Sequence, residues 1–153
     1  AKSIPGAQVF ATDIFPEVLK IAKQNAVKNQ LDISFFEDDI VNPKALNDSS
    51  QFDIIVSNPP YIRNMEKELM HANVLQNEPH PALFVPNSNA LIFYSAICDF
   101  ALQKLKIGGW LYFEINENLS SETSELIQTK GFTNIELKKD LFGKYRMMRG
   151  QKE

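Results

Sequence analysis

The chain has 153 residues, of which 44% are hydrophobic and 23% are charged, and its formal net charge is −3. This size and composition are sufficient for one compact domain with a real core. Lys and Arg are scattered along the chain, which argues against a nucleic-acid-binding surface. No stretch approaches the roughly 20 apolar residues of a membrane span, and no secretory signal pattern opens the chain, so no membrane contact is expected.

The cysteine and histidine content argues against a disulfide-bonded protein and against a metal site. The single cysteine, Cys98, lies in an apolar helical pattern and is expected to be a small core residue. A chain without cysteine pairs has no disulfide framework and suits the reducing cytoplasm. His71 and His80 have no cysteine or histidine partners at ligand spacing, so no metal site is expected.

Hydrophobic periodicity predicts strands alternating with helices, which indicates an α/β fold. Gly108 and Gly109 are expected to close the second helix, and Ser120 or Ser121 to cap the third. The connection over 61–87 is long enough to be functional, and we interpret it as a wall or lid on the substrate side. In chain order, the predicted elements are strand 8–13, helix 16–29, strand 33–36, strand 52–57, helix 88–106, strand 110–116, helix 120–131, strand 133–139 and strand 145–150.

The first predicted strand ends in an acid, Asp13, and Pro16 then opens a helix at the position where its missing N–H is tolerated. A carboxylate at the end of a strand, just before a helix, can bind ribose hydroxyls in nucleotide-binding folds. Asp13 is therefore a candidate ribose-binding residue. An acid at a helix start is equally common as a cap, and the sequence leaves both interpretations open.

The most informative motif is Asn58-Pro59-Pro60-Tyr61, which follows the apolar strand 52–57. Two consecutive prolines cannot donate backbone hydrogen bonds, and their φ is fixed near −65°. The strand must therefore stop, with an amide and an aromatic ring held in a stiff turn at its carboxyl end. Open α/β sheets bind ligands at this end of their strands. A strand that ends in a proline-rich turn is the simpler alternative for the tetrapeptide alone.

The tetrapeptide resembles the catalytic motif of class I methyltransferases that alkylate a planar exocyclic nitrogen. The resemblance implies a Rossmann-like, mostly parallel sheet with an antiparallel C-terminal hairpin, and S-adenosyl-L-methionine as methyl donor. It also implies catalytic roles for Asn58, Pro59, Pro60 and Tyr61. The Asn side-chain oxygen and the carbonyl of the first Pro would accept hydrogen bonds from the target NH2, and the aromatic ring would stack on the target plane.

Further segments narrow the resemblance to the protein-(glutamine-N5) methyltransferases of the HemK/PrmC type, which modify peptide chain release factors. The similarity runs to about Arg149 in unbroken motif order. We expect Glu78 to brace the long loop by hydrogen bonding, and a direct catalytic role for Glu78 is the alternative. The matching segments are Asp13-Ile14 with Pro16-Glu17, Val56-Ser57-Asn58-Pro59-Pro60-Tyr61-Ile62, Asn77-Glu78-Pro79-His80-Pro81-Ala82-Leu83-Phe84, Gly108-Gly109-Trp110-Leu111-Tyr112-Phe113-Glu114-Ile115 and Lys139-Asp140-Leu141-Phe142-Gly143-Lys144-Tyr145-Arg146.

The family resemblance also implies the cofactor contacts. The carboxylate that follows the strand 33–36 would bind the adenine amino group, and the next apolar residue would pack on the ring. Two positions depart from the family: Asn116 stands where Gly is usual, and Phe15 stands where a small residue is common. The implied cofactor-binding residues are Asp13, Ile14, Asp39, Ile40 and Asn58.

The family's glycine-rich cofactor loop is expected upstream of Asp13, where the chain offers only residues 1–7 and a single Gly6. We therefore expect residues 1–153 to be a truncated catalytic domain that lacks the first strand, this loop and the helical N-terminal domain. Strands 8–13 and 52–57 would then each have an exposed inner edge, and we expect self-association or an altered strand edge at this gap.

Three functions are compatible with this pattern. The first is methylation of a Gln side-chain amide in a release factor. The second is methylation of adenine in DNA or guanine in RNA by the same chemistry, and the third is an inactive truncated domain. The Glu-Pro…Ala-Leu segment and the absence of a basic or target-recognition insert favour the first over the second.

Overall fold

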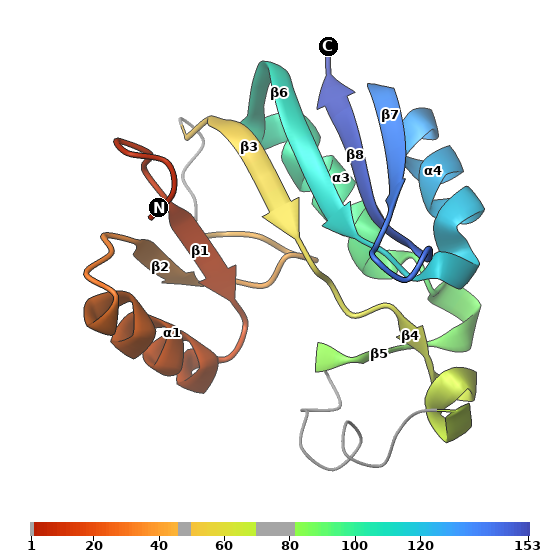
Figure 1. Cartoon of the computed structure of the whole chain (residues 1–153), viewed down its shortest axis with the longest axis horizontal. Helices are drawn as coiled ribbons and strands as arrows, with labels where there is room; N and C mark the ends of the chain where they lie inside the picture. Colours follow the sequence, from red (N-terminus) through yellow and green to blue (C-terminus); the bar gives the residue numbers. More distant parts are fainter. Residues whose placement is uncertain (1, 46–49, 70–81) are drawn as a thin grey trace. The chain divides into compact units, whose positions relative to one another are not determined.

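The computed structural model describes residues 2–45, 50–69 and 82–153. The chain forms two compact units, Ala1–Ser50 and Gln51–Glu153, which are described separately (Figure 1). None of the helices in these described ranges is long and apolar enough to cross a membrane.

The first unit is a strand–helix–strand unit made of β1 (Phe10–Asp13), α1 (Pro16–Lys28) and β2 (Ser34–Glu37). The two strands pair in parallel, and Asp13 lies opposite Glu37 at their carboxyl ends. Leu19 and Ala26 form the buried stripe of α1, and Pro16 begins the helix as predicted. Val18, next to Leu19 on the helix, is 40% exposed.

The second unit contains a four-stranded sheet in the order β3-β6-β8-β7. Strand β3 pairs with β6 in parallel, and β8 is antiparallel to both β6 and β7. This mixed sheet, with a parallel β3–β6 pair and an antiparallel C-terminal hairpin, is consistent with the predicted fold class. The strands are β3 (Phe52–Ser57), β6 (Leu105–Glu114), β7 (Phe132–Lys139) and β8 (Tyr145–Lys152).

Helices α3 (Ile92–Lys104) and α4 (Ser120–Thr129) lie on one face of this sheet (Figure 1). The remaining described segments are short: β4 (Ile62–Arg63) pairs in parallel with β5 (Phe84–Val85), and the described residues also form three 3-10 turns. These turns are η1 (Asn64–Leu69), η3 (Asn87–Asn89) and η4 (Glu117–Leu119). The predicted loop over 61–87 therefore carries short ordered elements in its described part.

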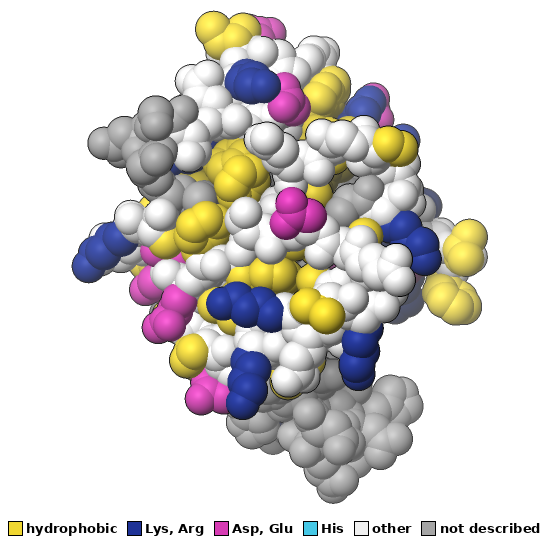
Figure 2. All heavy atoms as spheres, turned by 90° about the vertical axis from the view of Figure 1, so that its left-hand side faces the viewer, with side chains coloured by type: hydrophobic (Ala, Val, Ile, Leu, Met, Phe, Trp, Pro, Cys, Tyr) yellow, Lys and Arg dark blue, Asp and Glu magenta, His cyan; other side chains and the backbone are white. Residues whose placement is uncertain are grey.

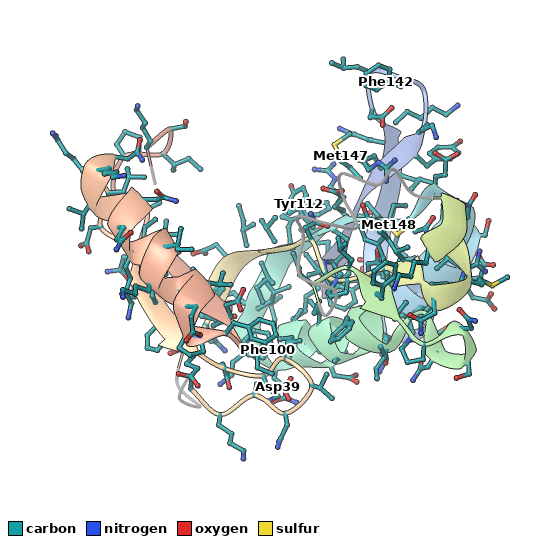
Figure 3. All side chains as sticks on the ribbon, turned by 90° about the horizontal axis from the view of Figure 1, so that it is seen from below. Asp39, Phe100, Tyr112, Phe142, Met147 and Met148 are labelled. Carbon is teal, nitrogen blue, oxygen red and sulfur yellow. The ribbon has the colours of Figure 1, made fainter. Side chains whose placement is uncertain are left out.

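Alternation along β6 separates the two faces of the sheet. Leu111 and Phe113 are buried, and Met148 of β8, opposite Phe113, is also buried. Figure 3 labels Met148 and Tyr112. Tyr112 belongs to the other face, where Ile54 and Val56 of β3 are 52% and 73% exposed. The hydrophobic core of the unit therefore lies between the sheet and the helix pair.

Cys98 of α3 is fully buried, which confirms its predicted place in the core. Burial raises the pKa of the Cys98 thiol to about 12, so the thiol stays protonated at neutral pH.

The predicted boundary between the second helix and the next strand was wrong. Helix α3 ends at Lys104, and β6 starts at Leu105 and runs through Gly108 and Gly109. A Cβ at Gly109 would lie 2.9 Å from the Lys106 carbonyl oxygen and 3.1 Å from the Asp53 carbonyl oxygen. The glycine therefore permits close approach of two backbones at the register shift between β3 and β6, instead of closing the helix.

Lys152 of β8 stabilises the end of α3. Its Nζ donates to the carbonyl oxygens of Leu102, at 2.5 Å, and Leu105, at 2.7 Å. A cation that binds the last carbonyls of a helix also interacts favourably with the helix dipole. A lysine 48 positions beyond the end of the helix thus replaces the predicted glycine stop, as the ends of α3 and β8 show.

The sheet pairings also bear on the expected missing strand. Within the described residues, β1 pairs with β2 and β3 pairs with β6, and β1 and β3 belong to different sheets. Each of the two strands thus lies at one end of its own sheet in the described part of the chain.

Candidate active site

The carboxyl ends of β3, β6 and β7 meet at one edge of the sheet in the second unit, because these three strands run in the same direction. Ser57, the last residue of β3, lies opposite Phe113 of β6. The Asn58–Tyr61 turn, which follows β3, is therefore beside the residues that follow Phe113. In this turn Asn58 is exposed, Pro59 is buried, and Pro60 and Tyr61 are half-buried.

Two hydrogen bonds fix Tyr61. Its hydroxyl donates to Glu114 Oε1 at 2.9 Å, and its carbonyl oxygen accepts from Asn116 Nδ2 at 3.2 Å. Burial, together with the neighbouring Glu114 carboxylate, raises the pKa of the Tyr61 phenol, and Arg146 opposes this rise only in part. The phenol is therefore a stable donor at neutral pH, and the ring is held in one place from both ends of the residue.

The carboxylate of Glu66, in η1, accepts four hydrogen bonds. Arg63 contributes its backbone N–H at 2.9 Å and its guanidinium at 3.1 Å, and Asn116 and Asn118 each donate an amide N–H at 3.3 Å. Burial acts to raise the pKa of Glu66, but the bonds and charge of Arg63 and the bond from Asn118 hold it below its ordinary value. Glu66 is thus an ionised anchor that joins the segment after the turn to η4.

Tyr94 of α3 contacts the carboxyl end of β6. Its hydroxyl donates to the Glu114 carbonyl oxygen at 3.1 Å, and its ring meets Phe113 edge to face at a centroid distance of 5.1 Å. The side chain is fully buried, and burial raises the pKa of its phenol. Tyr94 therefore fixes the backbone of Glu114, whose carboxylate accepts the hydrogen bond from the Tyr61 hydroxyl.

The first unit brings its predicted site residues together at the carboxyl ends of β1 and β2. The Asp38 N–H donates to the Asp13 carbonyl oxygen at 3.1 Å, which joins the two strand ends. Asp13 Oδ1 accepts from the Phe15 N–H at 2.8 Å, so this carboxylate also supports the entry to α1. Ile14 is 50% exposed, and Ile40 is half-buried.

Two neighbouring acids in this unit have different roles. Asp38 accepts from the backbone N–H groups of Asp39, Lys44 and Ala45 at 2.8–3.1 Å, and it therefore folds the loop after β2. Asp39 Oδ1 accepts from Val41 N at 2.9 Å. Since Asp38 is occupied by three backbone donors, Asp39 remains the better candidate for a contact with a ligand. Figure 3 labels Asp39 on this loop.

The family of the chain follows from its sequence match. Residues 1–84 match the family model described as the methyltransferase small domain. The chain belongs to the methyltransferase small-domain family. The matched residues include the Asn58–Tyr61 turn, Asp13 at the end of β1 and Asp39 after β2.

Two release factor glutamine methyltransferases are similar to almost the whole chain. The chain is 49% identical over 149 residues to a release factor glutamine methyltransferase of Flavobacterium psychrophilum, and 40% identical over 147 residues to one of Bacteroides thetaiotaomicron. These matches cover 97% and 96% of the chain but 52% of each relative, so the chain spans about half the length of these relatives.

The solved structures agree on the fold. A SAM-dependent O-methyltransferase from Thermotoga maritima is similar with a TM-score of 0.66 at 18% identity, and the match covers 95% of the chain and 50% of the solved one. At this identity the likeness shows the fold alone. It confirms the Rossmann-like methyltransferase fold that the motif order predicts for this family member.

Sequence analysis missed four residues that support the turn in this methyltransferase-family chain. Glu114 ends β6, the strand parallel to β3, and Asn116 follows it, so their place at the ligand edge was available as a signal. Glu66 pairs with Arg63 at i, i+3, which is a weak local signal. Tyr94 lies within the predicted helix 88–106, whose pattern carries no signal for a contact with the end of β6. Glu78, Met70 and Leu75 of the predicted loop lie outside the described residues.

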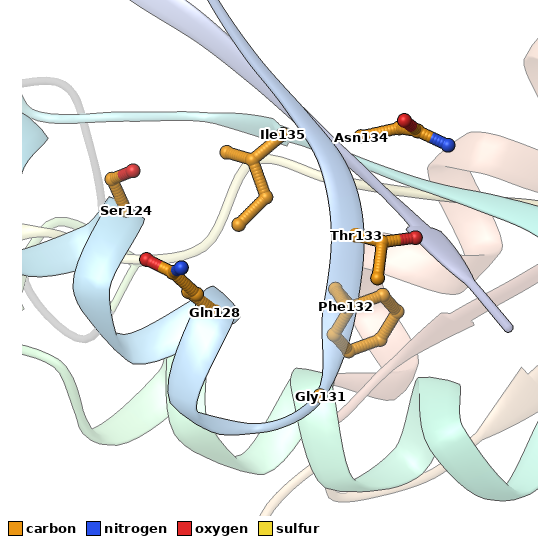
Figure 4. A pocket seen from close by; sticks show the side chains of 7 residues that line it. All are labelled: Ser124, Gln128, Gly131, Phe132, Thr133, Asn134 and Ile135. Atoms are coloured by element: carbon orange, nitrogen blue, oxygen red, sulfur yellow. The ribbon is translucent and has the colours of Figure 1, made fainter.

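Other surfaces of the described chain offer weaker candidates. A shallow hollow of about 500 Å³ between α4 and β7 (Figure 4) has no carboxylate and none of the predicted site residues in its lining. On the face shown in Figure 2, Lys and Arg side chains are interspersed with acidic and hydrophobic ones. Among the residues that the structure describes, no group of three or more His, Cys, Asp or Glu could hold a metal ion. The lining of the hollow is Ser124, Gln128, Gly131, Phe132, Thr133, Asn134 and Ile135.

The Tyr94 contact leads to a stability prediction. Replacing Tyr94 with Phe leaves the Glu114 carbonyl without this donor, and we expect a loss of about 1–2 kcal/mol in the free energy of unfolding. Urea denaturation followed by Trp110 fluorescence measures the second unit, because Trp110 is the only tryptophan of the chain. The matched control is Tyr145→Phe at a 40% exposed position, which should change little. Equal stability of both variants would contradict the prediction.

Proposed function

We propose that the chain carries the catalytic site of a methyltransferase that modifies the side-chain amide nitrogen of a Gln residue in a peptide chain release factor. The supporting observation is the Asn58–Tyr61 turn, in which an exposed Asn58 precedes a Tyr61 ring anchored by Glu114 and Asn116. The relatives that share about half of their length with the chain are named for this activity. The site of action would be the cytoplasm.

The chemistry of an amide explains the need for such a turn. The nitrogen lone pair is delocalised into the carbonyl, so the nitrogen is a poor nucleophile and must be oriented. Asn58, through its side-chain oxygen, and Pro59, through its carbonyl, would accept hydrogen bonds from the target NH2. Fixed acceptors of this kind stabilise the positive charge that develops on the nitrogen. Tyr61 would stack on the amide plane, and Pro60 would keep the turn stiff.

The first unit fits the nucleoside part of S-adenosyl-L-methionine, which would supply the methyl group. Asp13 and Asp39 end or follow neighbouring parallel strands, and both are half-buried carboxylates. Asp13 would accept from ribose hydroxyls and Asp39 from the adenine amino group, and Ile14 and Ile40 would provide apolar contacts to the adenosine. Asn58 is the cofactor contact proposed for the second unit.

The first test concerns the target-binding turn. We expect Asn58→Ala to lower kcat for methylation of a Gln-containing release factor about 10²–10³-fold, because a preorganised acceptor is lost at the reacting nitrogen. Transfer of radiolabelled methyl groups to the release factor measures the rate. The control is Asn89→Ala, an exposed Asn of the same unit, which should keep the rate. Methylation of DNA or RNA instead of the release factor would overturn the proposed substrate.

The second test concerns the nucleoside contacts. We expect Asp13→Ala to weaken the binding of S-adenosylhomocysteine about tenfold or more, because hydrogen bonds to a carboxylate contribute roughly 1.5–3 kcal/mol. Isothermal titration calorimetry of the chain measures the Kd directly. Asp32→Ala, which removes an exposed acid of the same unit, should leave the Kd unchanged. No heat at millimolar ligand with the unaltered chain would contradict a usable nucleoside site.

We also propose that the chain associates with itself through the edge of β3, where Ile54 and Val56 are exposed. Apolar edge strands favour pairing with another chain, and a lysine on such an edge opposes it. We therefore expect Val56→Lys to shift sedimentation velocity profiles toward the monomer, while Ser121→Lys on α4 leaves them unchanged. A monomer at every concentration of the unaltered chain would rule out this association.

A further inference from the structure

We propose that Asn116 is a positioning residue for the Asn58–Tyr61 turn: its amide, braced by Glu66, fixes the Tyr61 carbonyl and thereby sets the geometry with which the turn receives its target. This inference rests on the proposed function, because the turn is taken as the target-binding element. It goes beyond the family resemblance, in which Gly is usual at this position.

Asn116 uses both ends of its amide. Its Nδ2 donates to the Tyr61 carbonyl oxygen at 3.2 Å and to Glu66 Oε2 at 3.3 Å, and its Oδ1 accepts from the Asn118 N–H at 3.0 Å. The residue is 8% exposed, so water competes little for these bonds. One side chain thus joins three segments: the catalytic turn, η1 and η4.

The backbone does not explain the choice of residue. Asn116 has φ −72° and ψ 123°, an extended conformation that most residues can adopt. No feature of these angles requires Gly or Asn. The identity of the side chain is therefore explained by what its amide binds, and a Gly at this position would make neither the contact with Tyr61 nor the contact with Glu66.

The Asn116 contact complements the Glu114 contact on the same tyrosine. Glu114 holds the hydroxyl at the far end of the ring, and Asn116 holds the carbonyl at the backbone. With only the hydroxyl held, the backbone could still move and carry the Pro59 carbonyl with it. Because displacements of about 1 Å can cost roughly 10²-fold in rate, a contact at the backbone matters for orientation.

The test is Asn116→Ser in the full chain. Ser caps a helix start about as well as Asn, so the Asn118 N–H keeps an acceptor, while the shorter side chain no longer reaches Tyr61 or Glu66. We expect a thermal midpoint within about 4 °C of the unaltered chain, a kcat lowered on the order of tenfold, and an unchanged KM for the cofactor. The control is Asn89→Ser, at an exposed position of the same unit.

A second measurement does not depend on activity. NMR titration of tyrosine labelled with 13C at Cζ reports the pKa of each phenol, and Tyr61→Phe assigns the Tyr61 signal. In Asn116→Ser the pKa of Tyr61 should fall toward its ordinary value near 10, because the ring is held less firmly against Glu114 and inside its half-buried site. Ser adds no charge near the phenol, and Glu114 and Arg146 remain.

The outcomes separate this inference from the proposed function. A lower kcat together with a lower Tyr61 pKa supports the positioning role. An unchanged Tyr61 pKa overturns it, whatever the rate, since Asn116 would then be only a cap. If the unaltered chain transfers no methyl group to the release factor, the proposed function fails, and the Tyr61 titration alone decides the role of Asn116.

Discussion

The parallel pairing of β3 with β6 is the constraint on which the site depends. It places Ser57 opposite Phe113, so the turn after β3 and the residues after β6 leave the sheet side by side. Tyr61 can reach Glu114 and Asn116 only because of this register. A slip of one residue would turn the side chains of β3 to the opposite faces and remove both contacts. Gly109 permits the close backbone approach at the start of the same pairing.

Most of the fold was predictable because its signals are local. The strand over Phe52–Ser57 and the helix from Pro16 were confirmed, since apolar runs and proline positions determine them within a few residues. The end of α3 was not predictable. It depends on Lys152, which contacts the helix end from a strand far along the chain. The glycine pair that looks like a helix stop instead serves the packing of two strands.

The candidate site was likewise predictable only in its local part. The turn at Asn58 could be proposed from four adjacent residues, because two prolines restrict the backbone directly. The specific contacts of Tyr61 with Glu114 and Asn116 could not be predicted, since they span 53 and 55 positions. Asn116 stood out in the sequence only as a departure from a family pattern. The predicted caps at Ser120 and Ser121 were also wrong, because no side chain caps α4, and Asn116 instead caps the preceding turn.

The burial of Cys98 has a consequence for the chemistry of the whole chain. It is the single thiol among 153 residues, it is fully buried, and its pKa is raised to about 12. Thiolate-directed reagents therefore have no native target on the folded protein. Cysteines introduced at exposed positions would be the only reactive ones. Spectroscopic labels could thus be attached one per unit, without first replacing a native residue, to measure the distance between Ala1–Ser50 and Gln51–Glu153 in solution.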